Sequence, residues 1–142
     1  MFLSGKSVDQ NGEFITYTWA VAGDTIARIE VPKGFKENNW EYGEGIVTNL
    51  TYADSSYIVL HFGFNMSLPF LKSPEHLIYN EEKKSDRTIR YGRIQHTKLC
   101  WREENLYPIP INIAFSRVPA NKLKTFERSL ASIIIIKKVG AP

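Results

Sequence analysis

The clearest pattern of apolar and polar positions lies near the C-terminal end of the chain. Residues 110–118 (PINIAFSRV) place Ile111, Ile113 and Phe115 at every second position, with polar or small residues between them. This period of two is typical of a β-strand with one buried face.

The segment after this strand has a helical period. Between Asn121 and Ile136 the apolar residues Leu123, Phe126, Leu130 and Ile133 recur every three or four positions, and charged residues occupy the rest of the surface. This spacing predicts an amphipathic helix. We expect the isoleucines that end the segment to continue as an extended chain. A strand followed by such a helix gives a sheet something against which its apolar face is buried.

Two hairpins are predicted in the first half of the chain. Residues 14–21 and 25–31 are rich in β-branched and aromatic residues and flank Gly23-Asp24, a pair that favours a tight turn. Residues 45–52 and 57–64 flank a second turn, Ala53-Asp54-Ser55-Ser56. The last of these strands is apolar on both faces, which predicts a central strand of the sheet.

The remaining segments complete an α+β fold. Polar residues 36–44 indicate a loop or a short helical turn, and Ser73-Pro74-Glu75 predicts the start of a short helix that ends near residue 84. Further strands are expected at 88–95 and 97–103. The prediction is a mostly antiparallel sheet of six or seven strands, built from hairpins and packed against the C-terminal helix and the shorter one. It forms a single domain over residues 1–142, with 1–12 as a flexible N-terminal segment.

Composition limits the classes of function. The chain has 142 residues, is 43% hydrophobic and carries eight Phe, seven Tyr and three Trp, which is enough apolar surface for a core. A net charge of +3 is a weak argument for a polyanion partner. Cys100 is the only cysteine, so an intrachain disulfide and a cysteine-based zinc site are excluded. No apolar run approaches the ~20 residues of a membrane span, and the first residues do not form a signal peptide pattern.

The histidine and acidic residues do not form a recognisable catalytic or metal-binding motif. His61, His76 and His96 stand alone in the sequence, without a neighbouring ligand pair. The pairs Glu81-Glu82 and Glu103-Glu104 are expected at a solvated surface, since adjacent strand residues point to opposite faces. We therefore predict no cofactor and no metal, and we favour a protein without enzymatic activity.

A basic and aromatic stretch between residues 83 and 102 offers the first candidate contact surface. Its candidate contact residues are Arg90, Tyr91, Arg93 and Trp101. Strands of this composition can bind single-stranded nucleic acid through phosphate contacts and base stacking. Strand alternation places Arg90 on the face opposite Tyr91 and Arg93, and acidic pairs flank the stretch. A charged, solvated sheet face is the favoured interpretation, and nucleic-acid binding is the alternative.

Trp40 and Tyr42 form the second candidate contact surface. They lie in the polar segment 36–44, and exposed aromatic residues in loops often mark contacts with a partner. The alternative is that the segment packs these rings onto the edge of the sheet.

Several segments together resemble the PsbP-like α/β family. The segment Ile29 to Phe35 is a strand that ends in Pro-x-Gly-aromatic, and residues 52–58 form a hairpin turn. Trp101-Arg102-Glu103 precede a final strand and a helix with Phe126, Leu130 and Ile133. The resemblance implies an antiparallel sheet flanked by helices and a non-enzymatic binding or scaffolding role. It also implies a bacterial envelope protein, periplasmic or extracellular if a signal peptide has been removed and cytoplasmic otherwise.

The sequence therefore favours a non-catalytic binding or scaffolding module for a protein partner or a small ligand. One rival is a small-ligand carrier or enzyme with a pocket in a curved sheet, lined by Tyr17, Trp19, Phe62 or Phe115. The other is a single-stranded nucleic-acid binder that uses the basic residues between 83 and 102.

Overall fold

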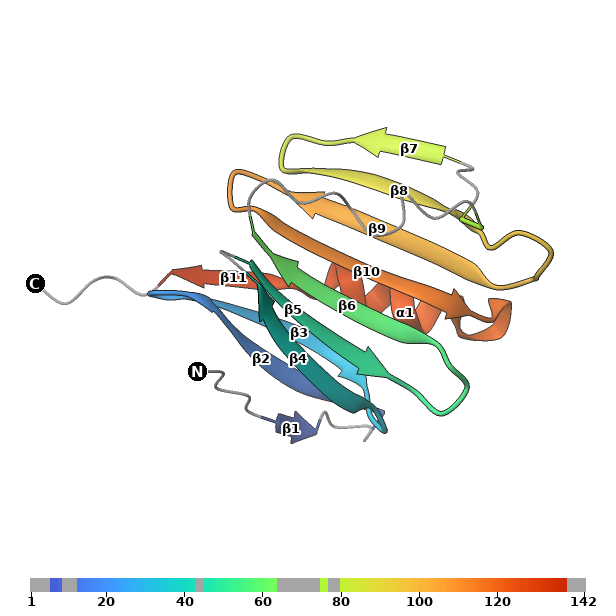
Figure 1. Ribbon diagram of the computed structural model, residues 1–142, viewed down its shortest axis with the longest axis horizontal. Coiled ribbons are helices and arrows are strands. Elements are labelled where there is room, and N and C mark those ends of the chain that lie inside the picture. The colour runs from blue at the N-terminus through green and yellow to red at the C-terminus, as the bar shows by residue number, and fades with distance from the viewer. Residues whose placement is uncertain (1–5, 9–12, 43–44, 64–74, 77–79, 138–142) are drawn as a thin grey trace, which may run out of the picture. The chain divides into compact units, whose positions relative to one another are not determined.

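A computed structural model describes residues 6–8, 13–42, 45–63, 75–76 and 80–137 (Figure 1). These residues contain eleven β-strands, a short 3₁₀ turn and one α-helix. The chain divides into two compact units, Met1–Gly34 with Lys124–Pro142, and Phe35–Leu123. The expected single domain over residues 1–142 stays a prediction.

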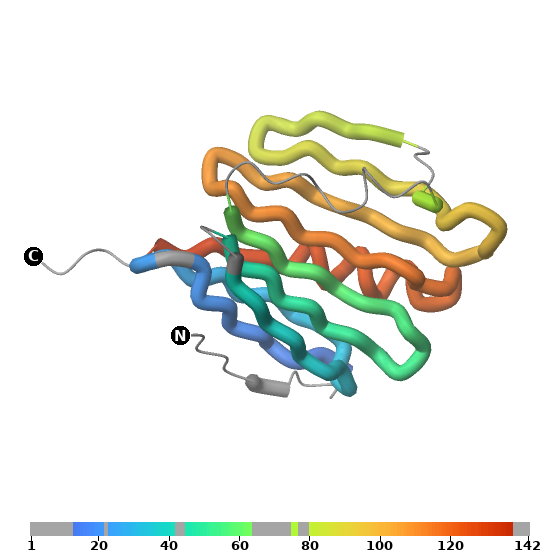
Figure 2. The backbone as a smooth tube through the Cα atoms, in the orientation of Figure 1, coloured from blue at the N-terminus to red at the C-terminus, as the bar shows by residue number. Residues whose placement is uncertain are grey.

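The first unit is built on a four-stranded antiparallel sheet. Its strand order is β1 (Lys6–Val8), β2 (Phe14–Ala22), β3 (Thr25–Pro32) and β11 (Ile134–Lys137). Strands β2 and β3 form the first predicted hairpin, whose turn contains Gly23 with a φ of 53°. The C-terminal strand β11 pairs with β3, so the sheet joins distant parts of the chain (Figure 2).

One face of this sheet is buried and the other carries polar side chains. The buried residues are Tyr17, Trp19, Ala27, Ile29 and Val31, none more than 1% exposed. The positions between them include Thr16 and Glu30, which are half-buried, and Arg28, which is exposed. This alternation is the period of two that a strand pair with one buried face adopts.

The C-terminal helix α1 spans Leu123–Ala131 and follows a 3₁₀ turn at Ala120–Lys122. Phe126 and Leu130 are buried while Arg128 is exposed, which confirms the amphipathic helix. The helix ends before the isoleucine run, which forms strand β11 and is the expected extended segment. Within the described part of the chain, no helix has the length and apolarity that crossing a bilayer requires.

The second unit is built on a seven-stranded antiparallel sheet, which confirms the predominantly antiparallel fold. Its strands, in spatial order, are β4 (Lys36–Tyr42), β5 (Gly45–Thr51), β6 (Tyr57–Phe62), β10 (Ile111–Val118), β9 (Cys100–Leu106), β8 (Arg87–Arg93) and β7 (Asn80–Lys83). Strands β5 and β6 form the second predicted hairpin, and β6 is central, as its apolar composition indicates.

The middle strand β10 is buried on both faces, whereas the sequence predicts one buried face. Residues 111–116 are all buried, including Asn112 and Ser116. Both polar residues use side-chain hydrogen bonds: Asn112 Nδ2 donates to Asn105 Oδ1 at 3.2 Å, and Ser116 Oγ lies 2.9 Å from His76 Nε2. These bonds compensate for the water that the Asn112 amide nitrogen and the Ser116 hydroxyl lose on burial.

Two further predictions of local structure are wrong. Residues 36–42 form the edge strand β4 rather than a loop, because they pair in full register with β5 while solvent solvates their polar side chains. Residues 80–83 form strand β7 rather than the end of the shorter helix, because they pair with β8. Residues 73–74 and 77–79, the rest of that predicted helix, lie outside the described residues.

Candidate functional site

The basic stretch predicted as a contact surface forms the β7-β8-β9 edge of the seven-stranded sheet. On strand β8, Arg90 and Tyr91 are both half-buried and point to opposite faces, and Arg93 is exposed at the end of the strand. Register pairs Arg90 with Glu103 and Tyr91 with Arg102. Arg90 therefore stands opposite a carboxylate on each neighbouring strand, Glu81 of β7 and Glu103 of β9.

On one face of this edge, Arg90 lies between two carboxylates. Its Nε donates to Glu81 Oε2 at 2.7 Å, and its Nη1 lies 3.7 Å from Glu103 Oε1. Glu81 is on the outermost strand β7 and is exposed, and the hydrogen bond from Arg90 lowers its pKa. Arg90 is thus engaged from both neighbouring strands.

On the other face, Glu104 binds two arginines. Arg87 Nη1 donates to its Oε1 at 2.8 Å and Arg102 Nε donates to its Oε2 at 2.9 Å. The Arg102 guanidinium also lies over the Tyr91 ring, 5.5 Å from its centroid. Three of the seven basic residues between 83 and 102, namely Arg87, Arg90 and Arg102, are therefore paired with carboxylates of the same sheet.

Glu103 and Glu104 are 1% and 3% exposed, so the prediction that this pair is solvated is wrong. Burial raises the pKa of Glu103 to about 7, and the nearby Arg90 opposes this rise. The 3.7 Å separation exceeds hydrogen-bonding distance, and neither carboxylate oxygen of Glu103 has a hydrogen-bond partner among the described residues. Glu103 is therefore a buried acid that is only partly ionised at pH 7.

Trp101 belongs to the core rather than to an accessible surface. Its side chain is 1% exposed and packs with Ile94 and Ala114. The edge of its ring faces His76, with the two centroids 5.5 Å apart. A contact with a partner needs an accessible ring, so the role of Trp101 in this structure is packing.

The histidines do not assemble a catalytic or metal centre among the described residues. His76 and Ser116 are hydrogen-bonded, but Ser116 is 0% exposed, so its hydroxyl is not open to a substrate. His61 is buried on β6, and His96 is exposed in the turn after Ile94. Burial lowers the pKa of both His61 and His76. No three His, Cys, Asp or Glu side chains of the described part gather closely enough to hold a metal ion.

Trp40 remains accessible on the edge strand β4. It pairs with Val47 of β5 and is 45% exposed. Tyr42 pairs with Gly45, and its side chain lies outside the described part of the structure. Its neighbours along the strand, Asn39 and Glu41, are polar and exposed.

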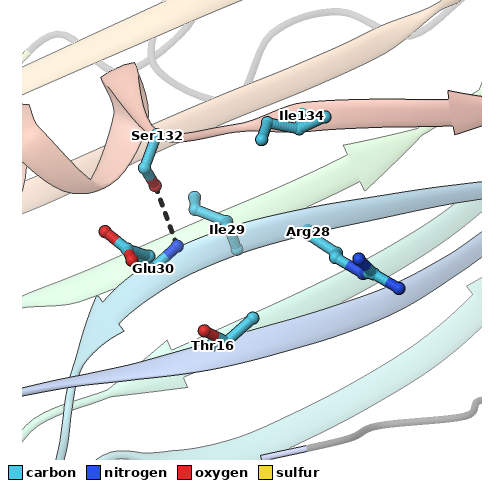
Figure 3. Close-up of a pocket in the computed structure, with 6 residues that line it drawn as sticks. All are labelled: Thr16, Arg28, Ile29, Glu30, Ser132 and Ile134. Carbon is cyan, nitrogen blue, oxygen red and sulfur yellow. Dashed lines mark hydrogen bonds between the residues drawn. The ribbon is translucent and has the colours of Figure 1, made fainter. Parts of the chain in front are cut away.

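A pocket on the four-stranded sheet was not predicted from the sequence. It has a volume of about 350 Å³. It is lined by Thr16 of β2, Arg28, Ile29 and Glu30 of β3, Ser132 after α1, and Ile134 of β11 (Figure 3). None of the aromatic residues suggested for a pocket lines it, since Tyr17, Trp19 and Phe115 are at most 1% exposed in packed interiors.

Local interactions hold one end of this pocket in place. The Ser132 hydroxyl accepts a hydrogen bond from the Glu30 backbone N–H at 2.8 Å and donates to the Ser129 carbonyl at 2.6 Å. The Glu30 carboxylate lies 3.7 Å from Arg128 Nη2, and the Arg128 guanidinium lies 4.1 Å from the centre of the Phe14 ring. The end of helix α1 is thereby fixed beside strand β3.

The other end of the pocket presents a free charge beside an apolar side chain. Arg28 is exposed, and no ion pair or side-chain hydrogen bond joins it to the described residues. Ile134 pairs with it across the sheet and is 60% exposed. In Figure 3 the Arg28 and Glu30 side chains extend in opposite directions, so the two charges lie at opposite ends of the pocket.

The pocket could not be predicted from the sequence because the β2–β3 hairpin supplies one part of its lining and the distant segment 132–134 supplies the rest. The available signal was the alternation of Ile26, Arg28 and Glu30 with buried residues, which marks an outer sheet face. Nothing in the sequence shows that Ser132 and Ile134 complete that face. Comparisons of this chain with models of protein families, with curated proteins and with solved structures found no match.

Proposed function

We propose that this protein is a non-catalytic binding module and that its binding site is the pocket on the four-stranded sheet. The observation that carries the proposal is the pairing of an unneutralised guanidinium, Arg28, with an exposed apolar side chain, Ile134, in a 350 Å³ concavity. A volume of this size lies within the range of small-ligand sites. Few convergent polar groups beside an apolar wall are also typical of such sites.

The arrangement of the seven-stranded sheet argues against the nucleic-acid alternative. Arg87, Arg90 and Arg102 all contact carboxylates of the same sheet. Releasing them to phosphates would leave Glu104 buried without its partners, at a high cost in free energy. The interaction of an exposed arginine with a phosphate gains too little free energy to offset that cost.

The resemblance to PsbP-like proteins remains part of the proposal. It suggests a bacterial envelope protein with a scaffolding or binding role. The predominantly antiparallel fold with a C-terminal helix is compatible with this suggestion without being specific to it.

A thermal-shift screen tests the proposal. The purified protein is heated with carboxylates, nucleotides, sugars, lipids, metals and short RNA, beside the variant Thr16→Tyr, whose larger side chain fills the pocket from β2. A ligand at 100 times its Kd stabilises a fold by about 2.7 kcal/mol, which is several degrees in a domain of this size. We expect a ligand that stabilises the wild type and not the variant.

Two results would contradict the proposal. A ligand that stabilises both proteins equally binds outside the pocket. A panel that stabilises neither protein would show that the pocket takes no small ligand of these classes, and a macromolecular partner would then be sought by pull-down.

A further inference from the structure

We infer that the pocket recognises a carboxylate attached to a short aliphatic chain. This inference rests on the proposed function and specifies the ligand class for that same site. It is argued from the charges, the register and the size of the pocket.

The charge at the pocket favours an anion. Arg28 has no partner among the described residues, whereas Glu30 already faces Arg128 at 3.7 Å. The two arginines and one glutamate leave one positive charge unbalanced, at Arg28. A planar guanidinium matches a carboxylate through two parallel hydrogen bonds, which a neutral amide does not reproduce.

The register of the sheet places an apolar surface next to this anion site. Ile134 is directly opposite Arg28 in the β3–β11 pair. Side chains at such paired positions have Cβ atoms about 5 Å apart. A ligand whose carboxylate binds Arg28 therefore has its first methylenes over Ile134, a side chain that is 60% exposed without a ligand.

The size of the pocket limits the length of the chain. A volume of about 350 Å³ is near the lower end for ligand sites. It suits an acid of a few carbons better than a long-chain lipid. The same chemistry also occurs at the C-terminus of a peptide that ends in an aliphatic residue, so the experiment includes both sources.

Calorimetric titration of the intact protein tests the ligand class with hexanoate, acetate and hexanamide. We expect hexanoate to bind at least ten-fold more tightly than either of the others, since acetate lacks the chain and hexanamide lacks the charge. A short acetylated peptide ending in Leu and its C-terminal amide form the second arm. We expect the peptide with a free C-terminal carboxylate to bind more tightly than its amide. If the peptide binds more tightly than hexanoate, the ligand is a peptide C-terminus; if hexanoate binds more tightly, the ligand is a small aliphatic acid.

Variants test whether Arg28 binds the carboxylate and whether Ile134 contacts the aliphatic chain. We expect Arg28→Gln to reduce hexanoate binding to the level of hexanamide, and Arg28→Lys to give an intermediate affinity because it keeps the charge and loses the paired geometry. Ile134→Thr keeps a β-branched residue on the strand and should remove most of the advantage of hexanoate over acetate. Lys33→Gln, an exposed charge of the same unit outside the pocket, is the matched control and should change the affinity less than two-fold.

Equal binding of hexanoate and hexanamide, no binding of hexanoate, or unchanged hexanoate binding by Arg28→Gln would overturn the inference. The experiments distinguish an error in the ligand class from an error in the proposed binding site. A neutral or cationic compound whose stabilising effect is lost in Thr16→Tyr would keep the pocket as the binding site and exclude carboxylates as its ligands.

Discussion

Two arginines of the β7-β8-β9 edge differ from Arg28 of the four-stranded sheet in whether a carboxylate neutralises their charge. Arg87 and Arg102 are 20% exposed and hold Glu104 between them. Arg28 is exposed and unpaired among the described residues. The comparison shows that a cluster of basic residues in a sequence does not by itself provide charge for a partner.

The largest expected effect comes from separating the edge arginines from their carboxylate. Glu104→Gln removes the buried charge that Arg87 and Arg102 share, and leaves Arg87 with the exposed carboxylate of Asp86. Breaking one partner of a buried ion pair typically costs 3–5 kcal/mol, so we expect a loss of about 4 kcal/mol in the free energy of unfolding. Urea denaturation at pH 7 measures it.

Glu82→Gln is the control for this experiment, because Glu82 is exposed on β7. Its unfolding midpoint should match the wild type. If Glu104→Gln were as stable as this control, the arginines of the edge would be free to bind a partner, and the contrast with Arg28 would disappear.

Glu103 makes the stability of the second unit depend on pH. Its pKa is raised from 4.5 to about 7, so the folded state favours the neutral acid. The contribution to stability is fully present below pH 4.5 and is lost as the pH rises through 7. Each pKa unit corresponds to about 1.4 kcal/mol, so the loss is about 3 kcal/mol.

The variant Glu103→Gln isolates this effect. It keeps a neutral side chain of similar shape at every pH, so it should equal the wild type near pH 4 and exceed its stability by about 3 kcal/mol at pH 8.5. Denaturation curves at the two pH values provide the measurement. A constant difference between the two proteins would mean that Glu103 is ionised normally in the folded state.

Removing the charge of Arg28 should have the smallest effect on stability and a large effect on binding. Arg28→Gln removes an exposed side chain without an internal partner, so the free energy of unfolding should change by less than about 0.5 kcal/mol. The thermal stabilisation by hexanoate should be lost in the same variant. A marked loss of stability without a ligand would show that Arg28 serves the fold rather than a partner.

The sequence predicts the β2–β3 and β5–β6 hairpins, strand β10 and helix α1, because turn residues and apolar periods act locally. It fails at β4 and β7, where polar composition conceals edge strands that only pairing with a neighbour defines. The burial of Glu103 and Glu104 follows from the position of β9 between β8 and β10. The pocket depends on the β3–β11 register, and this long-range pairing leaves no local signal in the sequence.

Backbone amide NMR during titration with hexanoate tests the central claim most directly, because it compares the two arginine sites in one sample. We predict chemical-shift changes at Thr16, Arg28 and Ile134 that saturate together, while the amides of Arg87 and Arg102 stay unchanged. Shifts confined to the β8–β9 edge would contradict this account. They would indicate that the β7-β8-β9 edge is the binding surface.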